Sequence, residues 1–229
     1  MPTKKLLLPL CVLACALGLG THAEGPSGPP SSSTRALGIG RLPSIGPWVC
    51  GRDGKPASWL GKRYRGRILL EPINIVIVDG LSKSEDGSIR EIEKLCADAG
   101  YKKRFGHSYG YLGKIGDRLL GQLPKEYRTA FAAAPAWETG NHCRLFGPMA
   151  WNGHYIYIGS ASRESFALFA LVHHDFVSYD QARDDFVDRS TGGGPCQRLV
   201  DLRLGNVRND DAYTTGDHDG NAAVLLLGR

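Results

Sequence analysis

Two stretches of the chain have the clearest spacing of apolar and polar positions. Residues 73–78, Ile-Asn-Ile-Val-Ile-Val, form a β-branched run after Pro72, which predicts a buried strand. Apolar positions then return with helical spacing, Ser88 and Glu91 have the spacing of a capping box, and Gly100 is suited to end the helix. The apolar stripe of this helix comprises Ile89, Ile92, Leu95, Cys96 and Ala99. A strand followed by a helix is therefore predicted.

Shorter patterns predict the remaining elements. A second capping box at Ser178 and Gln181 opens a helix that ends at the breaker 192–195. Its inward stripe comprises Tyr179, Ala182, Phe186 and Val187. Strands are expected at 143–146, 155–160, 199–204 and 222–227, with 166–173 closing a hairpin through a turn at Arg163-Glu164. Loops and a short helix at 125–133 are expected between residues 105 and 140, where glycines are frequent.

This order of elements indicates an α+β fold. It predicts a two-layer sandwich with a mixed, mostly antiparallel sheet, two main helices and ferredoxin-like elements. The composition agrees with an ordinary globular protein, since 42% of the residues are hydrophobic and 22% are charged. Glycine and proline, at 30 and 13 residues, argue against an all-helical bundle.

The first 47 residues differ from the rest. Residues 1–23 contain two lysines, an uncharged apolar stretch and Thr21-His22-Ala23, which together predict a cleaved signal peptide. Residues 24–47 are rich in Gly, Pro and Ser and predict a flexible tether before one domain at 48–229. We therefore expect a periplasmic or secreted protein with no transmembrane segment in the mature chain. A lipoprotein acylated at Cys15 is the alternative that the sequence favours less.

Charge and cysteine content narrow the function classes. Without the signal peptide the net charge is about +3, so no nucleic-acid partner is expected. Signatures of nucleotide cradles, α/β-hydrolases and zincins are absent from the mature sequence. Export would favour two disulfides. We expect Cys96 to pair with Cys143, because alternation turns Cys143 toward the helix layer, and Cys50 to pair with Cys196.

Polar residues at strand ends form the candidate site. Strand alternation places His142 and Arg144 on one face, and the expected hairpin brings His173 and His174 beside them. The candidate catalytic residues are His142, His173, His174 and Asp180, and the candidate ligand-binding residues are Arg144 and Arg183. We expect no tightly held metal and no cofactor, because a guanidinium on the same face would repel a cation and zinc needs three protein ligands. The alternative interpretation is structural. In it, the histidines donate hydrogen bonds to carbonyl groups, and the charged residues of the helix are solvated.

Around these residues the chain resembles the LssY C-terminal domain family of bacteria. The similar features are a first strand after Pro72, the strand His142-x-Arg144-Leu145, the strand 156–161, and His173-His174 followed by Asp180-x-x-Arg183-Asp184. The resemblance covers about residues 66–227. It implies a single domain with a shared polar site, in a family of undetermined biochemical activity.

Two functions are compatible with this site. The first is a non-enzymatic binding module of the bacterial envelope for a small anionic or glycan ligand, with Arg144 as the anchor. The second is a metal-independent hydrolase of the phosphoester type, in which a histidine is general base or nucleophile, Asp180 orients it and Arg144 stabilises developing charge. The sequence leaves open whether the protein is an enzyme.

Overall fold

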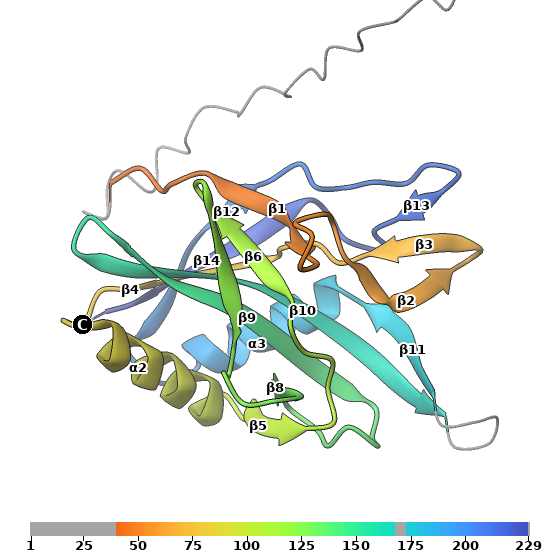
Figure 1. Ribbon diagram of the computed structural model, residues 1–229. Coiled ribbons are helices and arrows are strands. Elements are labelled where there is room, and N and C mark those ends of the chain that lie inside the picture. Colours follow the sequence, from red (N-terminus) through yellow and green to blue (C-terminus); the bar gives the residue numbers. More distant parts are fainter. Residues whose placement is uncertain (1–39, 168–172, 229) are drawn as a thin grey trace, which may run out of the picture.

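A computed structural model describes residues 40–167 and 173–228. Within these residues the chain forms a large sheet that curls into a half-barrel, with two helices against one face (Figure 1). The helices are α2 (Glu85–Asp98) and α3 (Asp180–Thr191). The strands are β1 (Ile45–Cys50), β2 (Ser58–Tyr64), β3 (Arg67–Leu70), β4 (Ile75–Asp79), β5 (Lys102–Phe105), β6 (Leu112–Ile115), β7 (Arg118–Leu123), β8 (Thr129–Ala132), β9 (Gly140–Trp151), β10 (His154–Ala167), β11 (His173–Ser178), β12 (Cys196–Arg203), β13 (Tyr213–Thr214) and β14 (Asn221–Leu227).

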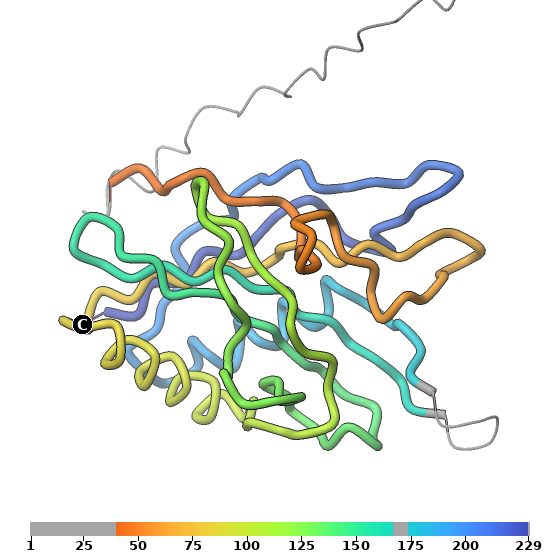
Figure 2. Tube along the Cα trace, viewed as in Figure 1, coloured from red at the N-terminus to blue at the C-terminus, as the bar shows by residue number. Residues whose placement is uncertain are grey.

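The large sheet is mixed. Its main path runs β1-β6-β7-β9-β10-β4-β14-β12, while β11 pairs with β10 and β5 joins through β8 to β9. The pair β4 and β14 is parallel, and the other pairs in this sheet are antiparallel. A small sheet, β13-β3-β2, lies beside it. The two longest strands, β9 and β10, run side by side through the centre of the domain (Figure 2).

The sheet has a hydrophobic core on each face. Ile75 and Ile77 of β4 pack with apolar residues of α2 and α3, whereas Val76 and Val78 pack on the opposite face with β1, β6 and β7. All five residues of β4 are buried, because both of its faces are covered. This explains why the β-branched run in the sequence is almost continuous rather than alternating.

The α+β class, with a mixed and mostly antiparallel sheet and two helices, is confirmed. The flat two-layer sandwich with ferredoxin-like elements is not confirmed, because the sheet curls and its second face is covered by its own strands. Helix α3 begins as predicted, with the Ser178 Oγ accepting a hydrogen bond from the Gln181 amide at 2.9 Å. Helix α2 begins earlier than predicted: Ser84 is its N-cap, and Ser88 lies inside the helix, bonded to the Tyr157 hydroxyl.

Two regions differ from the sequence predictions. Residues 125–133 form no helix; β8 lies there instead, with its four residues buried between β5 and β9. The expected turn at Arg163-Glu164 lies inside β10, which continues to Ala167 and then pairs with β11. The hairpin exists, but its connection falls in residues 168–172, outside the described residues.

The described residues show where the folded domain begins and whether any helix could cross a membrane. Strand β1 starts at Ile45, so its first three residues belong to the segment expected to be a tether. The expected signal peptide, residues 1–23, lies outside the described part of the chain. No helix among the described residues is long and apolar enough to cross a membrane.

Candidate functional site

A stripe of polar side chains lies on one face of the central strands. In the β9–β10 pair His142 is opposite Ser162 and Arg144 is opposite Ser160. Their sequence neighbours, such as Cys143, point to the other face and join the core beneath the helices. The expectation that His142 and Arg144 share a face is therefore confirmed. This stripe lies inside the curled sheet and is almost entirely buried.

Arg144 is part of a buried ion pair. Its guanidinium contacts the carboxylate of Glu71, and both side chains are only 1% exposed. The same guanidinium bonds to the Ser108 hydroxyl and lies over the ring of Tyr111, 5.3 Å from the centroid. Burial raises the pKa of Glu71, while Arg144 counteracts that increase. An arginine held in this way is a structural ion, so the expected role of Arg144 as a surface anchor does not fit its position.

His142 is held in a defined orientation beside Arg144. Its Nε2 lies 3.0 Å from the Ser162 Oγ, which also accepts a hydrogen bond from the indole N–H of Trp59 at 3.1 Å. Its other nitrogen, Nδ1, has no hydrogen-bond partner among the described residues and lies 3.5 Å from the Oε1 of Glu164. The ring of His107 stands next to it, with ring centroids 5.4 Å apart. Within the part of the chain that the structure describes, the buried Nε2 of His107 also lacks a hydrogen-bond partner.

The surroundings keep both imidazoles neutral. Burial lowers the pKa of His107 to about 4, and the charge of Arg144 contributes to the decrease. Burial and Arg144 also hold the pKa of His142 well below its usual range. Burial raises the pKa of Glu164 to about 7, despite the opposing effect of Arg144. At neutral pH the cluster therefore presents two unprotonated imidazole nitrogens and a carboxyl group near its midpoint of titration.

These three side chains have the arrangement of a metal-ligand set. One ligand atom each from His107, His142 and Glu164 can be chosen so that all lie within 4.8 Å of one another. Two ligands of a tetrahedral zinc ion, each 2.0–2.1 Å from the metal, would be about 3.3 Å apart. The 3.5 Å between His142 Nδ1 and Glu164 Oε1 is close to that value.

The two adjacent histidines of β11 take different positions. The Nδ1 of His174 lies 3.3 Å from the Oε1 of Glu164, and the side chain is 24% exposed. His174 thus borders the cluster on its solvent side. His173 begins β11 beside Ala167, but its side chain lies outside the described residues. The structure therefore places His142 and Arg144 on one face, as the sequence predicts, and brings His174 to His142 through Glu164, which lies near both histidines.

Asp180 and Arg183 belong to a second polar cluster. Arg183 Nη1 lies 3.2 Å from the Asp180 carboxylate and 2.8 Å from that of Asp219, and the Nε bonds to Asp184. The nearest histidine is His218, whose Nδ1 is 3.7 Å from Asp180 and whose Nε2 contacts Asn206. The hydrolase hypothesis has Asp180 orient one of His142, His173 and His174. For His142 this is wrong, because Glu164 lies beside its ring while Asp180 faces Arg183 and His218. Asp180, His218 and Asp219 could also surround an ion, but Arg183 already neutralises their carboxylates.

Sequence reasoning missed three members of the site. Glu164 was placed in a turn, although Ser160, Ser162 and Glu164 have the alternation of one strand face. Glu71 lies two residues before the first predicted strand, where a lone carboxylate gives no sign of its partner. His107 lies in a glycine-containing loop between β5 and β6, and no pattern in the sequence marks it.

The four cysteines of the domain are free thiols in the structure, and all are buried. Cys96, Cys143 and Cys196 belong to the core beneath the helices, as predicted for the first two. Burial raises the pKa of the Cys96 thiol well above its usual value and that of Cys196 to about 11. Neither expected disulfide is formed, and Cys50 does not belong to the core that holds its expected partner Cys196. Disulfide formation in the exported protein stays a prediction.

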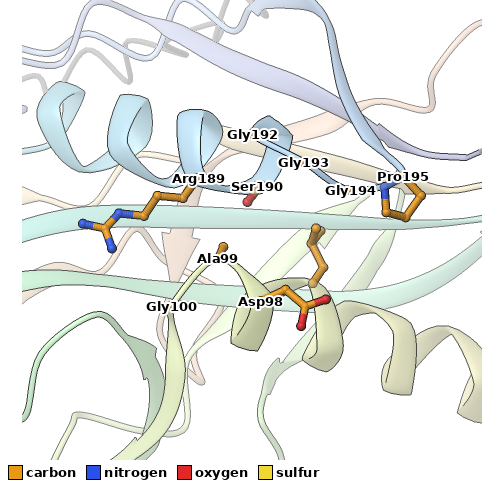
Figure 3. A pocket seen from close by; sticks show the side chains of 10 residues that line it. Asp98, Ala99, Gly100, Arg189, Ser190, Gly192, Gly193, Gly194 and Pro195 are labelled. Carbon is orange, nitrogen blue, oxygen red and sulfur yellow. The ribbon is translucent and has the colours of Figure 1, made fainter.

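Two cavities lie outside the histidine cluster. One, of about 670 Å³, lies between the C-terminal ends of α2 and α3 and is lined by Asp98, Gly100, Arg189 and the glycines 192–194 (Figure 3). Arg189, the one cation among its described lining residues, is already paired with Asp185 at 3.0 Å. The other, of about 550 Å³, lies over β6 and β7 and is lined by aromatic and basic residues.

No family model matches the chain, and neither a curated protein nor a solved structure is significantly similar to it. The resemblance to the LssY C-terminal domain family thus stays a prediction.

Proposed function

We propose that this domain binds one divalent transition-metal ion, of the zinc class, through His107, His142 and Glu164. The observation that carries the proposal is the pair of buried, unpartnered imidazole nitrogens next to a buried carboxylate. A buried acceptor without a donor costs about 1–3 kcal/mol, and a bound cation would remove that cost for both histidines. Neutral imidazole and carboxylate ligands are those that zinc prefers.

The neighbouring contacts support the same assignment. A histidine that ligates a metal through one nitrogen usually has its other nitrogen fixed by a hydrogen bond. For His142, the Ser162 hydroxyl occupies that position. The hydroxyl can accept the Nε2 proton, which leaves the lone pair of Nδ1 directed at Glu164.

The arginine on the same face does not oppose the proposal as the sequence suggested. The charge of Arg144 is balanced by Glu71, which the same stripe buries against it. With both carboxylates ionised and the imidazoles neutral, Glu71, Glu164 and Arg144 together carry one net negative charge. The ligand set also does not depend on His173 or on the end of a strand, since His107 and Glu164 complete it.

The proposal is tested by titrating zinc into protein that has first been freed of metal with a chelator, using calorimetry and metal analysis after dialysis. We expect one ion per chain for the unmodified protein. His107→Gln and Glu164→Gln should weaken binding more than about 100-fold, because even the residues that only orient a ligand are worth 10–100-fold. His154→Gln, which changes a half-buried histidine outside the cluster, is the matched control. Asp219→Asn tests the second polar cluster, and both controls should bind zinc normally.

Proton release gives an independent readout. Because the pKa of Glu164 is about 7, zinc must displace a proton from most molecules at pH 6 and from few at pH 8. We expect about one proton released per ion at pH 6 and nearly none at pH 8. Absence of zinc binding at micromolar concentrations, or unchanged binding by His107→Gln and Glu164→Gln, would overturn the proposal.

We also propose export from the cytoplasm, supported by the pattern of residues 1–23. The mature protein would then start at or near Glu24, which N-terminal sequencing of periplasmic or secreted material can establish. A chain that starts at an acylated Cys15 would indicate the lipoprotein instead.

A further inference from the structure

We propose that the cavity over β6 and β7 binds an anionic saccharide, a sugar unit that carries a carboxylate. The inference rests on different residues from the proposed metal site and does not depend on it. The cavity has a volume of about 550 Å³, which is within the usual range of small-molecule sites. Its lining combines uncommitted cations, tyrosine rings and one buried amide.

Three cations line the cavity without partners. Among the residues that the structure describes, Arg52, Arg118 and Lys125 form no ion pair and no side-chain hydrogen bond. One acidic residue, Glu85, also lines the cavity, so its net charge is positive. The exposed Arg198 and Arg208, by comparison, are paired with aspartates. A carboxylate in the cavity would find two guanidinium groups and an ammonium group.

The position of Arg52 is constrained by the loop before β6. Gly110 has a φ of +90°, and a Cβ at this residue would lie 3.1 Å from Nη2 and 3.3 Å from Nε of Arg52. The guanidinium of Arg52 therefore lies against Gly110, the residue between Tyr109 and Tyr111 in the sequence. This close approach places one cation at the loop that carries both tyrosines.

Tyrosine rings supply an apolar surface beside the charges. Tyr111 lines the cavity, and Arg144 stands over its ring from the protein interior. Tyr109 also lines the cavity and makes an edge contact with Tyr127, which is 71% exposed; the two ring centroids are 5.9 Å apart. Exposed tyrosine rings of this kind offer an apolar face that can stack against the C–H face of a sugar.

A buried amide favours a ligand with hydroxyl groups. Gln122 lines the cavity and is almost fully buried; its Nε2 contacts the carbonyls of Ser108 and Thr129. Its Oε1 has no hydrogen-bond partner in residues 40–167 and 173–228. A ligand hydroxyl could donate to this oxygen and remove an unsatisfied acceptor. A uronic acid combines the three features that this lining would bind: a carboxylate for the cations, a C–H face for the tyrosines and hydroxyl groups for Gln122.

The test uses the full mature chain and oligosaccharides of galacturonate, glucuronate and mannuronate, with binding measured by calorimetry. The methyl esters of the same oligosaccharides are the matched ligands without charge. We expect at least one of the three acids to bind, its methyl ester to bind at least about tenfold more weakly, and the affinity to fall with added salt. Arg118→Gln and Tyr109→Ala should each weaken binding at least about fivefold. Arg203→Gln, which removes an exposed charge on β12, should have no effect.

Three results would overturn the proposal: no binding of any of the three acids at millimolar concentration, equal binding of acid and ester, or normal binding by Arg118→Gln and Tyr109→Ala. Vesicles of anionic phospholipid are a separate arm, because aromatic and basic residues also occur at membrane surfaces. Capture by vesicles without binding of the acids would assign the surface to lipid and refute the saccharide. His107→Gln should bind the saccharide normally, so a failure of the metal proposal can be distinguished from a failure of this one.

Discussion

Replacing Arg144 by methionine removes the cationic half of the buried ion pair and keeps most of the aliphatic volume. The Glu71 carboxylate would then remain in the protein interior without its partner. The sequence alone places Arg144 at the surface, where its loss should shift the thermal midpoint by only a few degrees. The structure leads to the opposite expectation.

The magnitude follows from burial. Both side chains of the pair are 1% exposed, and removing one partner of such a pair costs about 3–5 kcal/mol. A protein of this size loses about 2–4 °C in thermal midpoint per kcal/mol, so the midpoint should fall by about 6–20 °C. Because total stabilities are about 5–15 kcal/mol, the variant should fold but be clearly impaired.

Thermal unfolding followed by circular dichroism, together with urea titration, measures the effect. Arg198→Met is the matched control, since Arg198 pairs with Asp201 at 2.7 Å but both side chains are half-exposed. Its midpoint should change by no more than about 2 °C. The double variant Glu71→Gln with Arg144→Met should lose less stability than the two single losses combined, because no isolated buried charge remains.

The pH dependence should identify Glu71 as the cause. Without Arg144, burial raises the pKa of the folded Glu71 carboxyl above its unfolded value, and a hydrogen bond from Ser160 opposes that increase. The stability from this group is then fully present below the unfolded pKa of about 4.3 and is lost as the pH rises. The deficit of Arg144→Met relative to the unmodified protein should therefore be smaller at pH 5 than at pH 8. A midpoint within 2 °C of the Arg198→Met control at both pH values would refute the buried-pair interpretation.

Three further predictions concern packing, pH and the thiols. Gly159→Ala should lower the free energy of unfolding by about 1–3 kcal/mol in urea titrations, because the added Cβ would lie 2.9 Å from the Arg144 carbonyl oxygen. Gly121 has open space around it, so Gly121→Ala should leave the free energy of unfolding nearly unchanged. The pKa of Glu164 is raised to about 7, so its contribution to the stability of the metal-free protein should decline as the pH rises from about 4.5 through 7. Glu164→Gln should remove this pH dependence. A stability difference between Glu164→Gln and the unmodified protein that stays constant with pH would contradict the prediction. In reduced protein the four buried cysteines should react with a thiol reagent only after unfolding, and rapid labelling of the native protein would exclude the observed packing.

The parts of the fold that were predictable from sequence are those in which local pattern and packing agree. Strand β4 is a β-branched run, and α3 carries both a capping box and an apolar stripe that the structure buries. The region from 105 to 140 was not predictable, because its strands are short and interrupted by glycines. At β8, three alanine or threonine residues surround Phe131, and only their burial between two other strands makes the segment extended rather than helical.

The candidate site likewise has a part that was predictable from sequence and a part that was not. Strand alternation was sufficient to place His142 and Arg144 on one face, since they are two residues apart in β9. The partners that decide what these side chains do come from elsewhere: Glu71 is 73 positions from Arg144, and Glu164 and His107 lie on other segments. Residue type and spacing within one strand contain no information about such contacts.

These distant partners reverse the roles that the two residues have when considered alone. An arginine next to a histidine argues against a cation site, because the guanidinium would repel the ion. Once Glu71 neutralises Arg144, the remaining effect of the guanidinium and of burial is to keep the imidazoles of His142 and His107 unprotonated. An unprotonated imidazole is the form that ligates a metal. Arg144 therefore favours the proposed metal site, because it helps to keep the imidazoles of His142 and His107 in the neutral form that can ligate an ion. Arg144→Met should raise the pKa of both histidines as well as destabilise the fold.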